Sequence, residues 1–212
     1  MTNFIPIFPL GTVAYPDEAV NLHIFEPRYI QMIHDIKAGT GLFGIIPVIQ
    51  QQIQEMGTCM ELLSIEKTYP GGEMDIKTRG VMVFRCLDII QEIPDKLYQG
   101  AIVNYPKNER HGLPGKQARI LLALRRLHVL TGAEKNYNKP DEALRTYDIA
   151  HQAGLSLQEE YELLCLLRED QRQEYLERHF YRLLPQMLDI NQLKSRIERN
   201  GHFRKISVDS ID

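Results

Sequence analysis

The stretch NLHIFEPRY, residues 21–29, decides how the first part of this chain folds. Leu22 and Ile24 predict the end of a buried strand. Pro27 predicts the start of a helix, because proline suits the first helical position, where its missing N–H would have no partner in any case. Apolar residues then follow at helical spacing up to a glycine that ends the helix (Tyr29, Ile30, Ile33, Ile36 and Gly39). The stretch therefore predicts a strand-to-helix joint.

The polar residues of this joint have structural roles in our interpretation. We expect the carboxylate of Glu26 to accept hydrogen bonds from free backbone N–H groups at the helix start, and Arg28 to join a local polar network. His23 precedes Glu26 by three residues, but the two straddle the joint, so packing and capping explain them better than a metal or acid–base site. Phe25 and Tyr29 are expected in the core.

Outward from the joint, residues 4 to 105 predict mostly strands. The predicted strands are 4–8, 42–48, 58–68, 73–77, 81–90 and 98–105. Tyr69-Pro70-Gly71-Gly72 is a strong turn signal between two of them. Several short strands with glycine turns and one early helix predict a mostly antiparallel, partly closed sheet.

The segment 105–115 is polar and rich in proline and glycine, and beyond it the pattern becomes helical. An apolar stripe over 120–130 predicts one helix, and Pro140 opens a second that ends at Gly154. Ser156 and Glu159 form a capping-box pattern for a third helix. A fourth follows over 175–188, where Pro185 should kink or break it. We therefore predict an α+β chain with a β-rich domain at 1–110, a small helical bundle at 111–203 and a loose tail at 204–212.

Composition indicates a soluble globular protein, with 43% hydrophobic and 25% charged residues and a net charge of −3. Cys59, Cys86 and Cys165 are too few and too scattered for a disulfide framework, so we expect reduced thiols. The sequence shows neither a signal peptide nor an apolar run of about 20 residues that could span a bilayer. These features favour the cytoplasm and exclude a membrane partner.

The motifs of common enzyme classes are missing from the sequence. It has no G-x-x-x-x-G-K-[ST] phosphate loop, no H-E-x-x-H, no C-x-x-C and no G-x-S-x-G nucleophile elbow. We therefore expect no catalytic residue, no metal ligand and no cofactor site. A nucleophile assembled from distant positions is not visible in a pattern of this kind, so a hidden hydrolase stays an alternative.

The same residues resemble a known family. Several motifs are similar, in order and rough spacing, to the N-terminal substrate-binding domain of Lon proteases, and the resemblance covers most of the chain. These motifs are Ile7-Phe8-Pro9-Leu10, Tyr15-Pro16, the 22–29 joint, Phe43-Gly44, Gly57-Thr58, Gly80 with Phe84-Arg85, and Leu155 to Glu160. Gly11 and Asp17 depart from the family pattern within one loop. The resemblance implies a PUA-like sheet and a non-catalytic domain, since ATP hydrolysis and proteolysis reside in later domains of those proteases.

The resemblance also implies a partner: an unfolded or tagged polypeptide, or another protein, with assembly into a homo-oligomer left open. Tyr15, Phe43 and Tyr69 are the candidate peptide-binding residues, because they lie near turns of the β-rich half. RNA binding is the alternative, since PUA-like sheets in other families hold RNA. The 13 acidic and 9 basic residues of 1–110 argue against it, because phosphate contacts need lysine and arginine.

Overall fold

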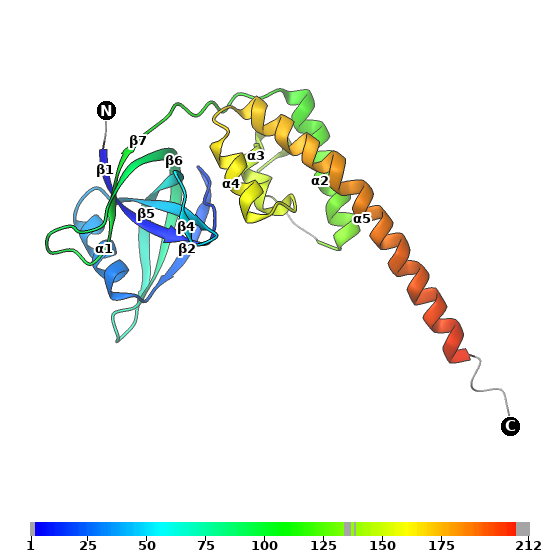
Figure 1. The fold of residues 1–212 in the computed structure, drawn as a ribbon, viewed down its shortest axis with the longest axis horizontal. Helices are drawn as coiled ribbons and strands as arrows, with labels where there is room; N and C mark the ends of the chain where they lie inside the picture. Colours follow the sequence, from blue (N-terminus) through cyan, green and yellow to red (C-terminus); the bar gives the residue numbers. More distant parts are fainter. Residues whose placement is uncertain (1–2, 134–136, 138, 207–212) are drawn as a thin grey trace. The chain divides into compact units, whose positions relative to one another are not determined.

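A computed structural model describes residues 3–133, 137 and 139–206, with side chains up to residue 193. It is a mixed α+β structure, which confirms the predicted fold class (Figure 1). The chain forms two compact units. The sheet unit comprises Met1–His111 and Arg145–Arg172, and the helical unit comprises Gly112–Leu144 and Gln173–Asp212.

The sheet unit is built on one partly closed sheet with the order β1-β7-β6-β5-β3-β4. β1 (Asn3–Leu10) pairs with β7 (Gly100–Asn104) on one side and with β3 (Leu42–Ile49) on the other, so it joins the two ends of the sheet. The β1–β3 pairing is parallel and the other pairings are antiparallel. The short β4 (Gln52–Ile53) pairs with β3, and β2 (Ala19–Ile24) pairs with β6.

Two long strands form the centre of the sheet, β5 (Met56–Thr68) and β6 (Met74–Ile90). The sequence predicted a break at Gly80, but β6 runs through it. The glycine is required by close packing, because a Cβ at this position would lie 2.0 Å from the backbone oxygen of Tyr15. Here glycine therefore marks a close backbone approach inside a strand.

The predicted joint and its helix are present. α1 (Pro27–Ala38) begins at Pro27 and lies against the sheet (Figure 1). Its buried face, Tyr29, Met32, Ile33 and Ile36, packs with strand residues such as Ile24 and Phe43 in one hydrophobic core. The alternation of the apolar residues with polar ones thus fixes which face of the helix meets the sheet.

The segment Arg145–Arg172 belongs to the sheet unit, although the sequence analysis placed it in a helical bundle at 111–203. The single helix predicted over 140–154 is divided into η1 (Asp141–Ala143), α3 (Thr146–Ile149) and η2 (Ala150–Gln152). One reason is that both the backbone N–H and the hydroxyl of Thr146 donate to the buried carboxylate of Glu169. The predicted capping box is present at the start of α4 (Leu157–Cys165), where Ser156 and Glu159 bond reciprocally.

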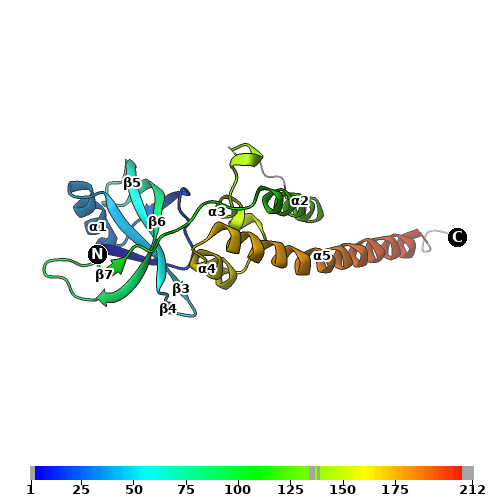
Figure 2. The same ribbon diagram turned by 90° about the horizontal axis from the view of Figure 1, so that it is seen from above.

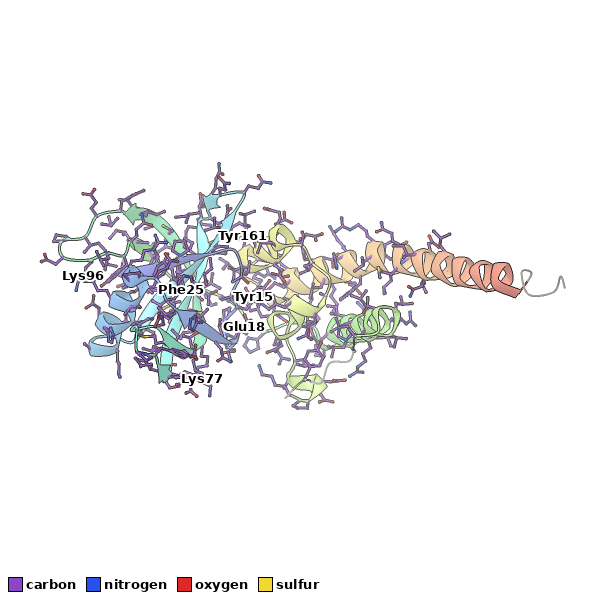
Figure 3. The ribbon with its side chains drawn as sticks, turned by 90° about the horizontal axis from the view of Figure 1, so that it is seen from below. Tyr15, Glu18, Phe25, Lys77, Lys96 and Tyr161 are labelled. Carbon is purple, nitrogen blue, oxygen red and sulfur yellow. The ribbon has the colours of Figure 1, made fainter. Side chains whose placement is uncertain are left out.

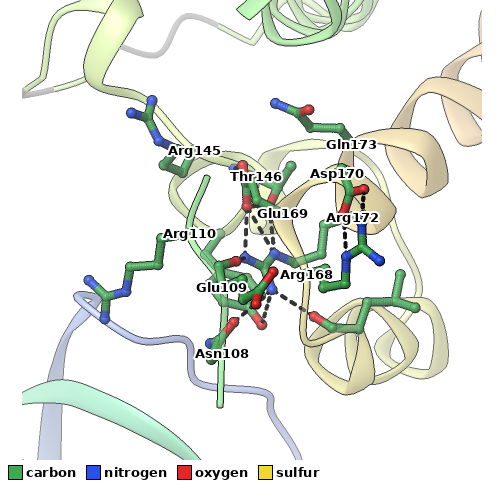
Figure 4. A network of polar contacts seen from close by, with 12 residues as sticks. Asn108, Glu109, Arg110, Arg145, Thr146, Arg168, Glu169, Asp170, Arg172 and Gln173 are labelled. Atoms are coloured by element: carbon green, nitrogen blue, oxygen red, sulfur yellow. Dashed lines mark hydrogen bonds and ion pairs between the residues drawn. The ribbon is translucent and has the colours of Figure 1, made fainter. Parts of the chain in front are cut away.

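A buried polar network holds this segment in the sheet unit (Figure 4). The Arg172 and Glu169 side chains are 1% exposed and form an ion pair of 2.9 Å. Arg172 also donates to Asn108 Oδ1 and to the carbonyls of Glu109 and Leu166, and its guanidinium lies 4.2 Å from the centre of the Tyr147 ring. Nearly all donors of the arginine thus have partners, which is what allows a charge to be buried.

The helical unit contains α2 (Pro114–Thr131), η1 and the greater part of α5 (Glu169–Ile206). α2 runs beside α5 in both views (Figures 1 and 2). Gly132 ends α2 in the left-handed conformation, with φ of 70°. α5 continues through Pro185 without a break. The predicted loose tail at 204–212 falls partly on α5, and residues 207–212 lie outside the described part of the chain.

Within the described residues, no helix is both long enough and apolar enough to cross a membrane.

Candidate functional site

The three predicted peptide-binding residues differ in exposure. Tyr15 and Phe43 are 0% exposed, so no ligand on the surface of this structure can contact them. Phe43 belongs to the hydrophobic core between α1 and the sheet. Tyr69 is half-buried and has neighbours at the surface. We therefore keep only Tyr69 in the candidate site.

Tyr15 is buried by the segment 145–172. Its ring stacks on Tyr147 at 4.9 Å between centroids, and its hydroxyl donates to the carbonyl of Glu160 at 2.9 Å. Tyr15, Glu18 and the Tyr161 of α4 lie on the same side of the sheet unit (Figure 3). This tyrosine thus connects the sheet to α3 and α4.

His151 makes a second connection there. Its Nδ1 lies 2.8 Å from Glu160 Oε1 and its Nε2 lies 3.1 Å from Glu18 Oε1. Burial alone would lower the pKa of His151, but the hydrogen bonds with Glu160 and Glu18 and their negative charges outweigh it and raise the pKa to about 10. The imidazole is therefore protonated at neutral pH, and it lies between two carboxylates.

Tyr69 belongs to a surface cluster at one end of β2 and β6, which we call the aromatic cluster: His23, Phe25, Lys67, Tyr69 and Asp75. Tyr69 donates to Asp75 Oδ2 at 2.8 Å, and His23 Nδ1 lies 2.7 Å from Asp75 Oδ1. These hydrogen bonds, from His23 and then from Tyr69, hold the pKa of the Asp75 carboxyl below its ordinary value. Asp75 therefore orients the rings of His23 and Tyr69.

Phe25 is the most exposed ring of the aromatic cluster, at 62%. Its ring is roughly parallel to His23, with 6.1 Å between centroids, and His23 meets Tyr69 edge-on at 5.7 Å. Lys67 Nζ lies 4.2 Å from the centre of the Tyr69 ring. The sequence prediction of Phe25 in the core is therefore wrong, because the chain turns into α1 at Pro27 and leaves this ring outside.

The edge of β2 is open next to the aromatic cluster. Among the residues that the structure describes, β2 pairs with β6 alone, in the register Ala19↔Arg79 to Ile24↔Met74. The Gly80 N–H donates to the Glu18 carbonyl at 2.8 Å, which fixes the alternation of hydrogen-bonded pairs. From this alternation we infer that Ala19, Asn21 and His23 direct their backbone N–H and C=O groups away from β6.

The outer face of β2, β6 and β5 is polar. Lys77 pairs with Glu66 at 2.7 Å and Arg79 pairs with Glu61 at 2.8 Å across adjacent strands. The other face of β2 carries Val20 and Leu22, which are half-buried against the core. A strand added to β2 would therefore meet apolar surface on one face and polar surface on the other.

The Glu26 prediction is wrong in its detail. Glu26 occupies the position before α1, with extended backbone, but its side chain makes no capping hydrogen bond. Its carboxylate instead accepts from Arg28, at 2.9 Å from Nε. The guanidinium is the stronger partner because it carries a full charge in a planar fork that suits a carboxylate. Arg28 also lies over the Tyr29 ring, 4.6 Å from its centre.

The described residues offer little for catalysis. They include no group of three or more His, Cys, Asp or Glu residues that could hold a metal ion. Burial raises the pKa of the Cys59 thiol to about 11, which keeps it protonated at neutral pH. The open β2 edge with its aromatic cluster is the candidate site.

Sequence reasoning missed two parts of this picture. The alternation of residues 19–24 could indicate a strand, but not that one side of it would stay unpaired. The Arg172 network joins residues up to 64 positions apart, and no local pattern marks it.

Comparisons with known proteins identify the family and the fold of this chain. The model of the ATP-dependent protease La (LON) substrate-binding domain matches residues 5–180. A Lon N-terminal domain protein from Xanthomonas campestris superposes with a TM-score of 0.63 at 20% identity, over 82% of this chain and 96% of that one. The N-terminal domain of Mycobacterium avium complex Lon protease gives a TM-score of 0.62 at 13% identity, over 84% of this chain and 98% of that one.

A curated relative is the Lon protease of Syntrophus aciditrophicus (strain SB), which is 26% identical over 106 residues. The match covers 44% of this chain and 13% of that protease. With the family model matching most of its length and the two solved structures sharing its fold, this chain belongs to the LON substrate-binding domain family.

Proposed function

We propose that this chain is a non-catalytic polypeptide-binding protein that binds extended segments of unfolded or tagged proteins along the open edge of β2. Family membership supports the choice of a polypeptide ligand. The proposal includes neither ATP hydrolysis nor peptide-bond cleavage by this chain. It also assigns the protein to the cytoplasm, which its free thiols support, because cysteines stay reduced there.

The observation that carries the proposal is the open β2 edge beside the aromatic cluster. An unfolded segment offers unpaired backbone groups and apolar side chains. The outward backbone groups of Ala19, Asn21 and His23 can pair with the backbone groups of the segment. The exposed ring of Phe25 can pack with its apolar side chains. In such strand addition, main-chain hydrogen bonds give affinity without much sequence specificity, which suits a receptor for varied clients.

Charge also favours a polypeptide over RNA on this unit. The sheet unit carries 12 lysine and arginine residues and 19 aspartate and glutamate residues, a net charge of −7. On the outer face of β6, Lys77 and Arg79 are already paired with carboxylates. A phosphate backbone would have to displace these pairs, at a cost in binding free energy.

The test uses fluorescently labelled peptides from a denatured protein, titrated with the full chain. Phe25→Ala should weaken binding by about fivefold to tenfold, the effect of losing an aromatic anchor. Leu97→Ala is the matched control, because Leu97 is 65% exposed and lies outside the cluster. It should leave the affinity unchanged.

A second pair of variants tests the backbone contacts. Asn21→Pro removes one outward N–H, which an edge strand tolerates, and should weaken every peptide similarly. Asn21→Ala keeps the N–H and should bind as the wild type does. If Phe25→Ala and Asn21→Pro bind normally, the site is elsewhere. If an RNA oligonucleotide binds and no peptide does, the proposed function is wrong.

A further inference from the structure

The helical unit has an apolar groove that the proposed function does not use. It lies between α2 and α5 and has a volume of about 430 Å³. Its lining is mainly apolar: Ile120, Ala123, Phe180, Tyr181, Leu184 and Pro185. Ile120 and Phe180 are 1% and 2% exposed, and Tyr181 is 83% exposed. The groove thus has a packed floor and an exposed aromatic wall.

The sequence explains why this space is open. Ala123 places only a methyl group on the α2 wall, where the neighbouring turns carry Ile120 and Leu127. Tyr181, Leu184 and Leu188 follow one another on one side of α5, and Leu188 is 48% exposed. The apolar surface therefore continues along α5 beyond the groove, so that it is long enough to contact one side of a bound helix.

Pro185 gives the groove a polar contact. Proline has no N–H, so it cannot donate to the carbonyl of Tyr181, four residues before it in α5. Both residues line the groove. The Tyr181 carbonyl is thus free of its usual helical donor next to the apolar wall, and it can accept a hydrogen bond from a ligand side chain.

The charges beside the groove favour an acidic ligand. Arg119 and Glu177 both line the groove and pair with each other, with 2.6 Å between Nε and Oε1, so this pair adds no net charge to the groove. Arg126 is exposed on α2, one turn after Ala123. The helical unit carries 13 basic and 9 acidic residues, a net charge of +4, opposite in sign to the sheet unit. An acidic partner is therefore attracted to this unit and repelled by the other.

We propose that the α2–α5 groove binds an acidic amphipathic helix of another protein. Apolar side chains of that helix, spaced at i, i+3 or i+4 and i+7, enter the groove against Phe180 and Tyr181, and its flanking carboxylates face Arg126. This is helix-in-groove recognition, in which the spacing of the anchors gives specificity. The site is separate from the β2 edge and does not depend on the proposed function.

The test uses a labelled helical peptide of about 15 residues, long enough for three to four turns, with leucines at this spacing and flanking glutamates. Its binding to the full chain is followed by fluorescence anisotropy. Ala123→Leu fills the groove and should lower the affinity about tenfold or more. Ala118→Leu makes the same change at an exposed position of α2 outside the groove lining and should have less than about a twofold effect.

Charge and periodicity have their own controls. Arg126→Glu should weaken the acidic peptide and strengthen a version with lysines in place of the glutamates. Phe25→Ala should not change either affinity, which separates this site from the β2 edge. Failure of the acidic peptide to bind, equal binding of a scrambled peptide, or normal binding by Ala123→Leu would overturn the proposal. A dimer of the free chain that Ala123→Leu dissociates would assign the groove to a second copy and overturn it too.

Discussion

The sheet unit and the helical unit differ in where they direct their polar and apolar groups. The sheet unit buries charge, as Arg172 and Glu169 are both 1% exposed, and it encloses aromatic rings such as Tyr15. The helical unit has ion pairs at the surface, such as Arg119–Glu177 and Arg125–Asp141, and leaves Tyr181 and Val129 each 83% exposed. The partners of Arg172 come from α3, from the residues after α4 and from the segment 108–109, so several elements together satisfy the buried charge. The Arg119–Glu177 pair, which joins α2 and α5, is instead in contact with solvent.

The largest effect should come from breaking the buried ion pair. Arg172→Ala leaves the Glu169 carboxylate buried without its cation and should lower the free energy of unfolding by about 3–5 kcal/mol. Denaturant unfolding of the full chain measures this loss. The control is Arg119→Ala, which removes an exposed pair in the helical unit and should change stability little. If both variants lowered the free energy of unfolding equally, the buried and the exposed ion pair would contribute alike, which would contradict the difference between the units.

Glycine substitutions compare packing in the two units. Gly80→Ala would place a methyl group 2.0 Å from the Tyr15 backbone oxygen, so it should destabilise by about 2–3 kcal/mol. Gly115, in the first turn of α2, has nothing within 4 Å of an added Cβ. Gly115→Ala should therefore be neutral or stabilise by up to about 1 kcal/mol. Thermal denaturation distinguishes these outcomes, and a tolerated Gly80→Ala would show that β6 can move away from Tyr15.

The pH dependence of stability tests the contact of His151 with Glu18 and Glu160. Because folding raises the pKa of His151 to about 10, its contribution is complete below its unfolded pKa near 6.5 and is lost as the pH rises towards 10. The side chain is 34% exposed, so solvent reduces the contribution to about 1–2 kcal/mol. The difference in unfolding free energy between wild type and His151→Gln should be largest near pH 6 and shrink steadily above it. A difference that grows with pH would contradict this assignment.

The smallest effect concerns Glu26. Because its carboxylate bonds to Arg28 at the surface and not to the helix start, Glu26→Ala should change stability by less than about 0.5 kcal/mol. Chemical denaturation is sensitive enough to detect a larger loss. A loss of about 1–2 kcal/mol would mean that the side chain caps α1 after all.

Local patterns predicted much of the fold. Pro27 marks the start of α1, Ser156 and Glu159 mark α4, and the apolar segments mark the strands, because each of these signals depends on neighbours in the sequence. The return of 145–172 to the sheet unit was not predictable, since it depends on Arg172 reaching Asn108 and Thr146. For the same reason Tyr15 looked accessible in the sequence: what covers it lies more than 130 residues later.

The candidate site was predictable only in part. Tyr69 follows from its turn, but the exposure of Phe25 depends on the angle at which the chain enters α1. The open edge of β2 depends on how the whole sheet is assembled, since a further strand paired with β2 would have covered it. A binding site at a sheet edge is therefore harder to predict from the sequence than the position of a helix or a strand.

An extended polypeptide should pair with β2, and amide hydrogen exchange followed by NMR tests this pairing directly. On addition of an unfolded-protein peptide, the amides of Ala19, Asn21 and His23 should exchange more slowly, because they gain hydrogen-bond partners. Amides of β6 that already bond to β2 should change little. Slower exchange confined to residues outside β2, or no change at a peptide concentration that saturates binding, would contradict the account.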